Sequence, residues 1–262
     1  MADEVYLFSE SYTYKPDAVA TSSGGNDIAG HLPADSIDYD MNSYWENDAA
    51  LPVLKIDLGA ATYAIDSLWF KHSNIDTYTL EHSPDDIVYT AVADGDAGSG
   101  GSSQWLTEFT EQTKRYWKLS VTAKVGGGNT YIYDIMLMKM RLAITDPDNM
   151  PAMITVVPGD RSGGSYELAN GALTSYSGEK THVGIDLSFT YTPKANRDNL
   201  LALYNTDADG NANLRSSLVI FPDSEYPDDI YRVLWSDTNF PLTYQIGYKL
   251  SGWKGTLKFQ EY

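Results

Sequence analysis

Short apolar segments separated by turn residues recur along the whole chain, and this spacing is what most constrains its fold. The clearest segment runs from His182 to Tyr191, where apolar residues alternate with Gly, Asp, Ser and Thr. A period of two residues is that of a β-strand with one buried face. Comparable segments follow at short intervals with turn signals between them, which is typical of an antiparallel β-sandwich. The pattern therefore predicts an all-β protein.

The expected strands lie in both halves of the chain. They are Val53 to Leu58, Tyr63 to Phe70, Tyr78 to His82, Arg115 to Val121, Tyr131 to Met140, Leu218 to Phe221, Ile230 to Trp235, Leu242 to Lys249 and Trp253 to Phe259. One helix is expected after Pro193, where an apolar stripe beginning at Leu200 follows the polar residues 196–199. Residues 94–103 are rich in Gly and Ser and predict a loop.

A cluster of Pro and Asp residues separates the two β-rich halves. Residues 141–151 contain Asp146, Pro147 and Asp148, a composition that predicts a linker. A chain of 262 residues is long enough for two domains, each with its own core. We therefore predict a β-sandwich at residues 1–141, a linker at 142–150 and, at 151–262, a second β-rich domain with one short helix that serves docking or assembly.

The charge and the cysteine content exclude several classes of function. The net charge is −18, from 36 acidic and 18 basic residues, so the protein repels nucleic acid and anionic membrane surfaces and favours neutral or cationic partners. The same acidity also maintains solubility. The absence of cysteine excludes disulfides, thiolate metal sites and a cysteine nucleophile. No apolar run approaches the ~20 residues of a membrane helix, and the polar N-terminus is unlike a signal peptide.

Motifs of catalysis are missing from the sequence. Its four histidines form no H-E-x-x-H arrangement, and there is no G-x-S-x-G elbow, phosphate-binding loop or dinucleotide fingerprint. Acidic pairs are frequent at this composition, so a carboxylate pair of the glycosidase kind stays open as an alternative. We predict a structural or binding protein that is not an enzyme.

A polar loop dense in oxygen ligands precedes one of the expected strands. Asp38, Asp40, Asn42 and Ser43 lead to Trp45, and the strand that follows ends at a "DLG" segment, residues 57–59. Hard cations such as Ca²⁺ take six to eight oxygen ligands, which acids and amides on a tight loop supply. The alternative is a metal-free turn held by hydrogen bonds from Asp and Asn side chains to the backbone.

Several segments together resemble the discoidin, or coagulation factor 5/8 type C, family of galactose-binding-like domains. Besides the loop and its DLG strand they are ATSSGG at 20–25, YTLEHSPDD at 78–86, RYWKLSV at 115–121 and YIYDIML at 131–137. They occur in the order and spacing of that family between Ala18 and Met140. The resemblance implies a jelly-roll β-sandwich that attaches to a glycan or to a neighbouring protein.

The resemblance also implies a calcium site. Asp38, Asp40 and Ser43 occupy positions of the family's calcium loop, and Asp134 matches its later acid on the last strand. Two positions depart from the pattern: Ser43 replaces the usual Thr, and Tyr39 replaces a Gly that reaches positive φ freely. A calcium ion held by Asp38, Asp40, Ser43 and Asp134 is the expectation, with the metal-free turn as its alternative.

Carbohydrate contacts are expected on loops at one end of the sandwich. Sugars stack on aromatic faces and bond their hydroxyls to amides, acids or histidines, and by loop position the candidates are Tyr44, His72, Asn74 and Trp105. The alternative for each is a structural role, since aromatic residues at strand ends usually complete the core. The tryptophans expected in the core are Trp45, Trp69 and Trp117.

A second oxygen-rich loop spans residues 205–216. Asn205, Asp207, Asp209 and Gly210 imitate the first positions of an EF-hand loop, but Ser216 stands where the bidentate Glu belongs. This loop is therefore predicted to be a solvated turn.

The second half is similar to tail and baseplate proteins of bacteriophages. The similar segments are KTHVGIDLSFTY, the step from strand to helix at LLALYN, and YPDDIYRVLW. With the missing signal peptide, this predicts a non-enzymatic structural or adhesion protein of a virion, assembled in the host cytoplasm. Its expected partners are other tail proteins, further copies of itself and a cell-surface glycan. The alternatives are a free bacterial carbohydrate-binding protein, a module of a glycan-acting enzyme, or a virion protein that has lost its sugar site.

Overall fold

The protein forms two compact units, each built mainly of β-strands. The computed structural model describes residues 5–38, 40, 42–60, 63–96, 105–144, 153–157, 161–167, 173–181, 184–205, 217–221, 230–236, 239–246 and 251–261. One unit contains Phe8–Met140, and the other combines Met1–Leu7, Arg141–Glu225 and Asp229–Tyr262. We call them the sandwich unit and the C-terminal unit. The prediction of an all-β protein with one short helix is confirmed within the described residues.

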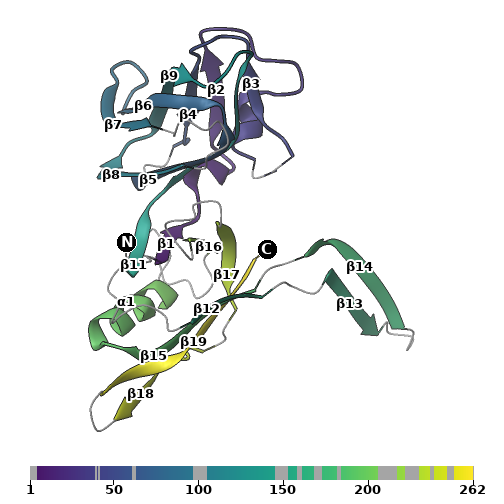
Figure 1. Cartoon of the computed structure of the whole chain (residues 1–262), viewed down its shortest axis with the longest axis vertical. Helices are drawn as coiled ribbons and strands as arrows, with labels where there is room; N and C mark the ends of the chain where they lie inside the picture. The colour runs from purple at the N-terminus through teal and green to yellow at the C-terminus, as the bar shows by residue number, and fades with distance from the viewer. Residues whose placement is uncertain are drawn as a thin grey trace. The chain divides into compact units, whose positions relative to one another are not determined.

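The sandwich unit consists of two antiparallel sheets (Figure 1). One sheet has the strand order β2-β4-β9-β6-β7, and the other has the order β3-β10-β5-β8. The strands are β2 Val19–Ser23, β3 Trp45–Asn47, β4 Val53–Asp57, β5 Ala64–Ser73, β6 Ile75–Ser83, β7 Thr90–Asp96, β8 Trp105–Thr113, β9 Tyr116–Lys124 and β10 Thr130–Met138. Two 3₁₀-helices, η1 Tyr12–Tyr14 and η2 Pro33–Ser36, lie in the connecting segments.

Aromatic side chains from both sheets fill the space between them. From Tyr116 to Val121 of β9, buried and half-buried positions alternate, as the pleat of a strand with one buried face requires. Phe70 of β5 meets Tyr78 of β6 edge to face at 5.3 Å, and Phe109 of β8 lies 5.7 Å from Trp117 of β9. Each large apolar side chain removed from water contributes roughly 2–3 kcal/mol to folding.

The loop and strand between residues 37 and 59 are fixed at both ends. Trp45 is completely buried, as predicted, and its indole Nε1 donates a hydrogen bond to Asp27 at 2.8 Å. Gly59 has φ +80°, and a Cβ at this position would lie 2.6 Å from Cβ of Asp17. Only glycine combines that backbone conformation with so close an approach, which explains the glycine that closes this strand.

The C-terminal unit is organised around one large sheet. Its strand order is β11-β1-β16-β17-β19-β15-β12, with β18 added on β19, while β13 and β14 form a separate two-stranded sheet (Figure 1). The strands are β1 Val5–Ser9, β11 Met140–Ile144, β12 Met153–Val157, β13 Arg161–Glu167, β14 Leu173–Thr181, β15 Gly184–Thr192, β16 Ser217–Phe221, β17 Tyr231–Trp235, β18 Thr243–Ile246 and β19 Ser251–Glu261.

The helix α1 Lys194–Asn205 packs on the core of this unit. Leu200, Leu203 and Tyr204 are buried, a spacing of three and four residues that places them on one helical face. Tyr204 meets Trp235 of β17 edge to face at 5.0 Å. The predicted helix after Pro193 is thereby confirmed. No helix in the described part of the chain is long and apolar enough to cross a membrane.

Some boundaries differ from those expected. The predicted strand Tyr131 to Met140 is two strands, β10 and β11, which divide at Lys139. The predicted linker 142–150 begins inside β11, where Leu142 and Ile144 are buried at alternate positions, and its remaining residues lie outside the described part. The predicted loop 94–103 begins inside β7. The first strand of the chain, β1, lies in the sheet of the C-terminal unit, although the sequence assigned residues 1–141 to the sandwich. The domain boundaries at 1–141 and 151–262 remain a sequence prediction.

Candidate functional site

Strand β10 carries two tyrosines on the outer face of the four-stranded sheet. Tyr131 and Tyr133 are half-buried, whereas the residues between and beside them are buried, because alternate side chains of a strand point to opposite faces. The register places Tyr131 opposite Glu46 of β3. The pairing of β10 with β5 brings His72 beside Tyr133.

Five aromatic rings meet on this face. Tyr44 stacks on His31 with ring centroids 3.9 Å apart and on Tyr133 at 4.8 Å. Tyr131 meets Tyr133 edge to face at 6.2 Å, and His72 also meets Tyr133 edge to face, at 5.7 Å. We call His31, Tyr44, His72, Tyr131 and Tyr133 the aromatic cluster. Four of its members are half-buried and His72 is exposed, so the cluster is open to solvent.

Polar groups border the aromatic cluster. Asn129 donates its Nδ2 to Oε1 of Glu46 at 2.8 Å, and this holds the carboxylate beside Tyr131. Burial, together with the negative charge of Glu46, raises the pKa of Tyr44, so its hydroxyl keeps its proton at neutral pH and remains a hydrogen-bond donor. Stacking surfaces, a hydroxyl donor and a carboxylate acceptor are thus gathered on one face.

His72 has an unusual backbone conformation. Its φ is +41°, in the left-handed region that few residues other than glycine adopt. Such strain persists only where the surrounding structure holds it in place, and it is concentrated at functional positions. His72 is a predicted carbohydrate contact, and its exposed ring lies edge to face against Tyr133.

The other predicted carbohydrate contacts lie elsewhere or have another role. Asn74 is only 6% exposed, its Nδ2 donates to the carbonyl of Asn129 at 2.8 Å, and its Oδ1 accepts from the backbone N–H of Tyr131 at 3.0 Å. Its amide is therefore committed to the backbone, where it positions Tyr131. Trp105 begins β8 and pairs with Phe70, and its side chain lies outside the described part.

The sequence reading missed His31, Tyr131 and Tyr133. A signal was present in the segment YIYD, because tyrosines two positions apart on a strand share one face. His31 carried no comparable signal, because it reaches the cluster only through the fold of the loop that precedes β3.

The predicted calcium loop gathers oxygen atoms around one hydroxyl. Ser43 Oγ lies 2.9 and 2.8 Å from the two carboxylate oxygens of Asp38, 2.9 Å from the carbonyl of Asp40 and 3.3 Å from the carbonyl of Asp35. One hydroxyl proton satisfies only one of these four acceptors. The Asp40 carboxylate accepts instead from the backbone and side chain of Asn42, both at 3.0 Å, so the residue offers the loop centre its carbonyl.

Asp134 is the fourth predicted ligand, and its environment is unusual. The residue is 1% exposed; Tyr14 donates its hydroxyl to Oδ2 at 2.6 Å, and Oδ1 is buried without a hydrogen-bond partner in the described part of the protein. Burial, together with the nearby charge of Asp38, raises its pKa to about 7. A buried carboxylate oxygen without a partner, close to a second carboxylate, is stabilised by a cation.

The candidate donors are all oxygens, the ligand type that Ca²⁺ prefers. The carboxylate of Asp38 and the carbonyls of Asp35 and Asp40 surround the hydroxyl of Ser43, and the buried carboxylate of Asp134 lies near enough to sense the charge of Asp38. No described group of three or more His, Cys, Asp or Glu side chains is arranged to hold a metal.

In the second oxygen-rich loop only Asn205 is described, so the prediction for residues 206–216 lies outside the described part.

Solved structures of carbohydrate-binding modules resemble about half of this chain, whereas no protein-family model and no curated sequence matches it significantly. CpGH89CBM32-5 from Clostridium perfringens, in complex with GalNAc-β-1,3-galactose, is 20% identical over 49% of this chain and 99% of its own, with a TM-score of 0.43. The family 32 CBM from C. perfringens NanJ, in complex with galactose, is 16% identical over 51% of this chain and 99% of its own, with a TM-score of 0.42. Chitosan-binding module 1 from a chitosanase/glucanase of Paenibacillus sp. IK-5 is 15% identical over 48% and 97%, with a TM-score of 0.43.

Proposed function

We propose that the sandwich unit binds a neutral glycan on the aromatic cluster. The observation that carries the proposal is the stack of His31, Tyr44 and Tyr133, joined by Tyr131 and His72, on a solvent-facing sheet surface. Soluble proteins rarely leave a group of aromatic rings of this size open to water without a binding role. Because the rings are held by one another and by two strands, they lose little freedom when a ligand binds.

The polar border of the cluster suits sugar hydroxyls. Glu46 accepts hydrogen bonds, and the hydroxyls of Tyr44, Tyr131 and Tyr133 both donate and accept. The C–H faces of a pyranose ring pack on the aromatic rings while its hydroxyls bond to these groups. A net charge of −18 repels anionic ligands and so favours an uncharged glycan.

Calcium has a structural role in this proposal. Asp38, Ser43 and Asp134 would hold the ion together with the carbonyls of Asp35 and Asp40. When bound, the ion neutralises the buried charge of Asp134 and draws the loop oxygens together. The loop leads directly into Tyr44 and Trp45, so a fixed loop holds one ring of the aromatic cluster in place.

We keep the wider prediction from the sequence, a non-enzymatic adhesion protein in a bacteriophage tail or baseplate. The alternatives are a free bacterial carbohydrate-binding protein and a module attached to a glycan-acting enzyme. Immunogold labelling of purified phage particles with an antibody to this chain distinguishes the virion role from both alternatives. Labelled tails are the expected result, and label confined to the soluble bacterial fraction contradicts the virion role.

The glycan proposal is tested by titration of the full chain. Galactose and N-acetylgalactosamine are the first probes, followed by an array of neutral bacterial glycans. Tyr133→Ala should weaken binding about tenfold or more, because it removes the ring at the centre of the cluster. Tyr116→Ala is the control, since this half-buried tyrosine lies in the other sheet of the sandwich. Equal affinity of the two variants, or no binder on the array, contradicts the proposal.

A further inference from the structure

The two most exposed large apolar side chains in the described part of the protein lie on different compact units. Ile246 is 85% exposed at the end of β18, and Ile87 is 80% exposed in the loop between β6 and β7, beside Val88 at 67%. Isolated apolar residues on a surface are ordinary, but adjacent exposed ones on one loop are typical of contact sites. We call residues 85–88 the tip.

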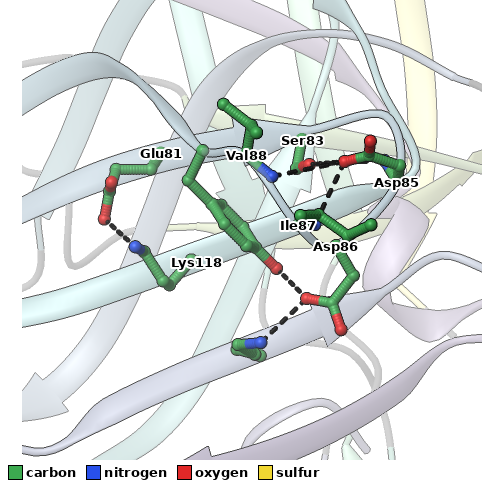
Figure 2. A network of polar contacts seen from close by, with 9 residues as sticks. Glu81, Ser83, Asp85, Asp86, Ile87, Val88 and Lys118 are labelled. Atoms are coloured by element: carbon green, nitrogen blue, oxygen red, sulfur yellow. Dashed lines mark hydrogen bonds and ion pairs between the residues drawn. The ribbon is translucent and has the colours of Figure 1, made fainter.

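A network of hydrogen bonds fixes the backbone of the tip. Asp85 Oδ1 accepts from the hydroxyl of Ser83 at 3.0 Å and from the backbone N–H groups of Ile87 at 3.0 Å and Val88 at 3.3 Å, as Figure 2 shows. Asp86 adopts a φ of +61°, which turns the chain at this point. The apolar side chains at 87 and 88 are therefore presented on a preformed turn.

Side chains from β4, β6 and β9 anchor the same loop. Lys55 of β4 pairs with Asp86 at 2.8 Å, and the hydroxyl of Tyr89 donates to the same carboxylate. Lys118 of β9 lies 4.4 Å above the ring of Tyr89 and pairs with Glu81 of β6 at 2.6 Å, a pair visible in Figure 2. A loop held this firmly loses little conformational entropy when it binds a partner.

The strands β18 and β19 of the C-terminal unit present a matching surface. Tyr244 lies opposite Trp253, and Ile246 lies two positions further along β18, so the side chains of Tyr244, Ile246 and Trp253 share one face of the hairpin. The rings of Tyr244 and Trp253 are 5.3 Å apart, and the guanidinium of Arg197 lies 4.4 Å from the centre of the Trp253 ring. We call Tyr244, Ile246 and Trp253 the finger face.

The two surfaces have opposite charge. On β19 the exposed Lys254 follows Trp253 directly, in a chain with twice as many acids as bases. Beside the finger face, Lys194 and Arg197 share the single carboxylate of Asp198, which leaves one positive charge. At the tip, Asp86 is paired with a lysine, whereas Asp85 forms no ion pair with any described residue. The tip is thus apolar and negative, and the finger face is apolar and positive.

We propose that the tip of one molecule docks on the finger face of a second copy of this chain. Such a contact is heterologous, because it joins two different surfaces, and its repetition produces rings or filaments. The apolar side chains supply the attraction and the complementary charges orient it. The proposal concerns assembly and goes beyond glycan binding by the sandwich unit.

The contact is small, so we expect weak association, with a Kd on the order of 0.1 mM in solution. Sedimentation velocity of the full chain should be measured at about 0.15 M salt, where the Debye length of ~8 Å screens the overall repulsion between acidic copies. The sedimentation coefficient should then rise with protein concentration. Ile87→Ser and Ile246→Ser should each weaken the association about tenfold or more. Both side chains are exposed, so neither variant should lose thermal stability.

Mixing the two variants gives the sharpest test. Each variant keeps one intact surface, so an equimolar mixture should form one tip-to-finger contact and stop at the dimer. Leu51→Ser, which alters a 53% exposed side chain elsewhere on the sandwich unit, is the control and should associate like the unaltered chain.

Three results would overturn the proposal. A sedimentation coefficient independent of concentration would exclude self-association through these surfaces. An Ile87→Ser variant that associates like the unaltered chain would show that the tip takes no part in the contact. Association with polygalacturonate that is lost in Ile246→Ser, in a chain that otherwise stays monomeric, would assign the finger face to an anionic glycan.

Discussion

Tyr14 donates its hydroxyl to the carboxylate of Asp134 at 2.6 Å, across 120 positions of sequence. The bond ties η1 to the centre of β10 inside the sandwich unit. It satisfies only one oxygen of a carboxylate that is almost completely buried. The other oxygen has no hydrogen-bond partner in the described part, and the negative charge of Asp38 is near enough to raise the pKa of the group. The stability of the sandwich unit should therefore respond both to pH and to calcium through this one side chain.

The pH response follows from the pKa of Asp134. Burial raises this pKa from 3.8 to about 7, so between pH 4 and 7 the folded protein binds a proton that the unfolded chain releases. The contribution of this proton to the free energy of unfolding is fully present below about pH 4, and it is lost as the pH rises through 7. Relative to Asp134→Asn, the unaltered chain should lose on the order of 4 kcal/mol across this range.

The measurement is urea denaturation of both proteins at several pH values with a chelator present. Comparison of the two proteins cancels the many other acids of the chain. If the difference in unfolding free energy between the unaltered chain and Asp134→Asn stays constant from pH 4 to 8, the pKa of Asp134 is not raised by folding.

The calcium response should separate two neighbouring acids. Asp38→Ala should abolish the rise in melting temperature that calcium causes, because it removes a carboxylate from the centre of the loop. Asp40→Ala should keep that rise, since the carboxylate of Asp40 bonds to Asn42 and only its carbonyl faces the centre. At about 100 times the Kd, calcium stabilises by about 2.7 kcal/mol. Thermal melts with calcium and with chelator test this, and an equal response of the two variants would favour a metal-free turn.

Asn74 should act on the glycan site through Tyr131. Asn74→Ala leaves the backbone N–H of Tyr131 and the carbonyl of Asn129 without their partners, which costs about 1–3 kcal/mol of stability. Asn129→Ala removes only a bond to the half-exposed Glu46 and should cost less than about 1 kcal/mol. Chemical denaturation measures both costs. Glycan titration of Asn74→Ala should show weaker binding, and unchanged affinity would argue against a positioning role.

Gly59 allows strain and crowding to be measured separately. Gly59 and Gly126 have φ values of +80° and +78°, but an added Cβ meets Asp17 at 2.6 Å in the first case and nothing within 4 Å in the second. Gly126→Ala should therefore cost about 1 kcal/mol from backbone strain alone. Gly59→Ala should cost at least about 2 kcal/mol more, because the strand end must shift. Equal melting temperatures of the two variants would contradict the crowding.

The local sequence determined which segments become strands and where the helix lies. The alternation in β15 and β9 predicts strands because a pleated strand with one buried face has a period of two, and no tertiary information is needed to see it. The apolar stripe of α1 follows from the same reasoning at a helical period. Trp45 was expected in the core for its place beside a strand, and it is completely buried.

Tertiary structure decided which of these segments meet. Tyr133 joins Tyr44 and His31 only because β10 pairs with both β3 and β5, and strand pairing over such distances is a property of the whole fold. Asn74 was read as a ligand residue, yet the loop before β10 closes on its amide and gives it a structural role. Residue type and spacing identified the strands and several polar candidates; register and burial decided which side chains gather into a surface and which are used to hold it.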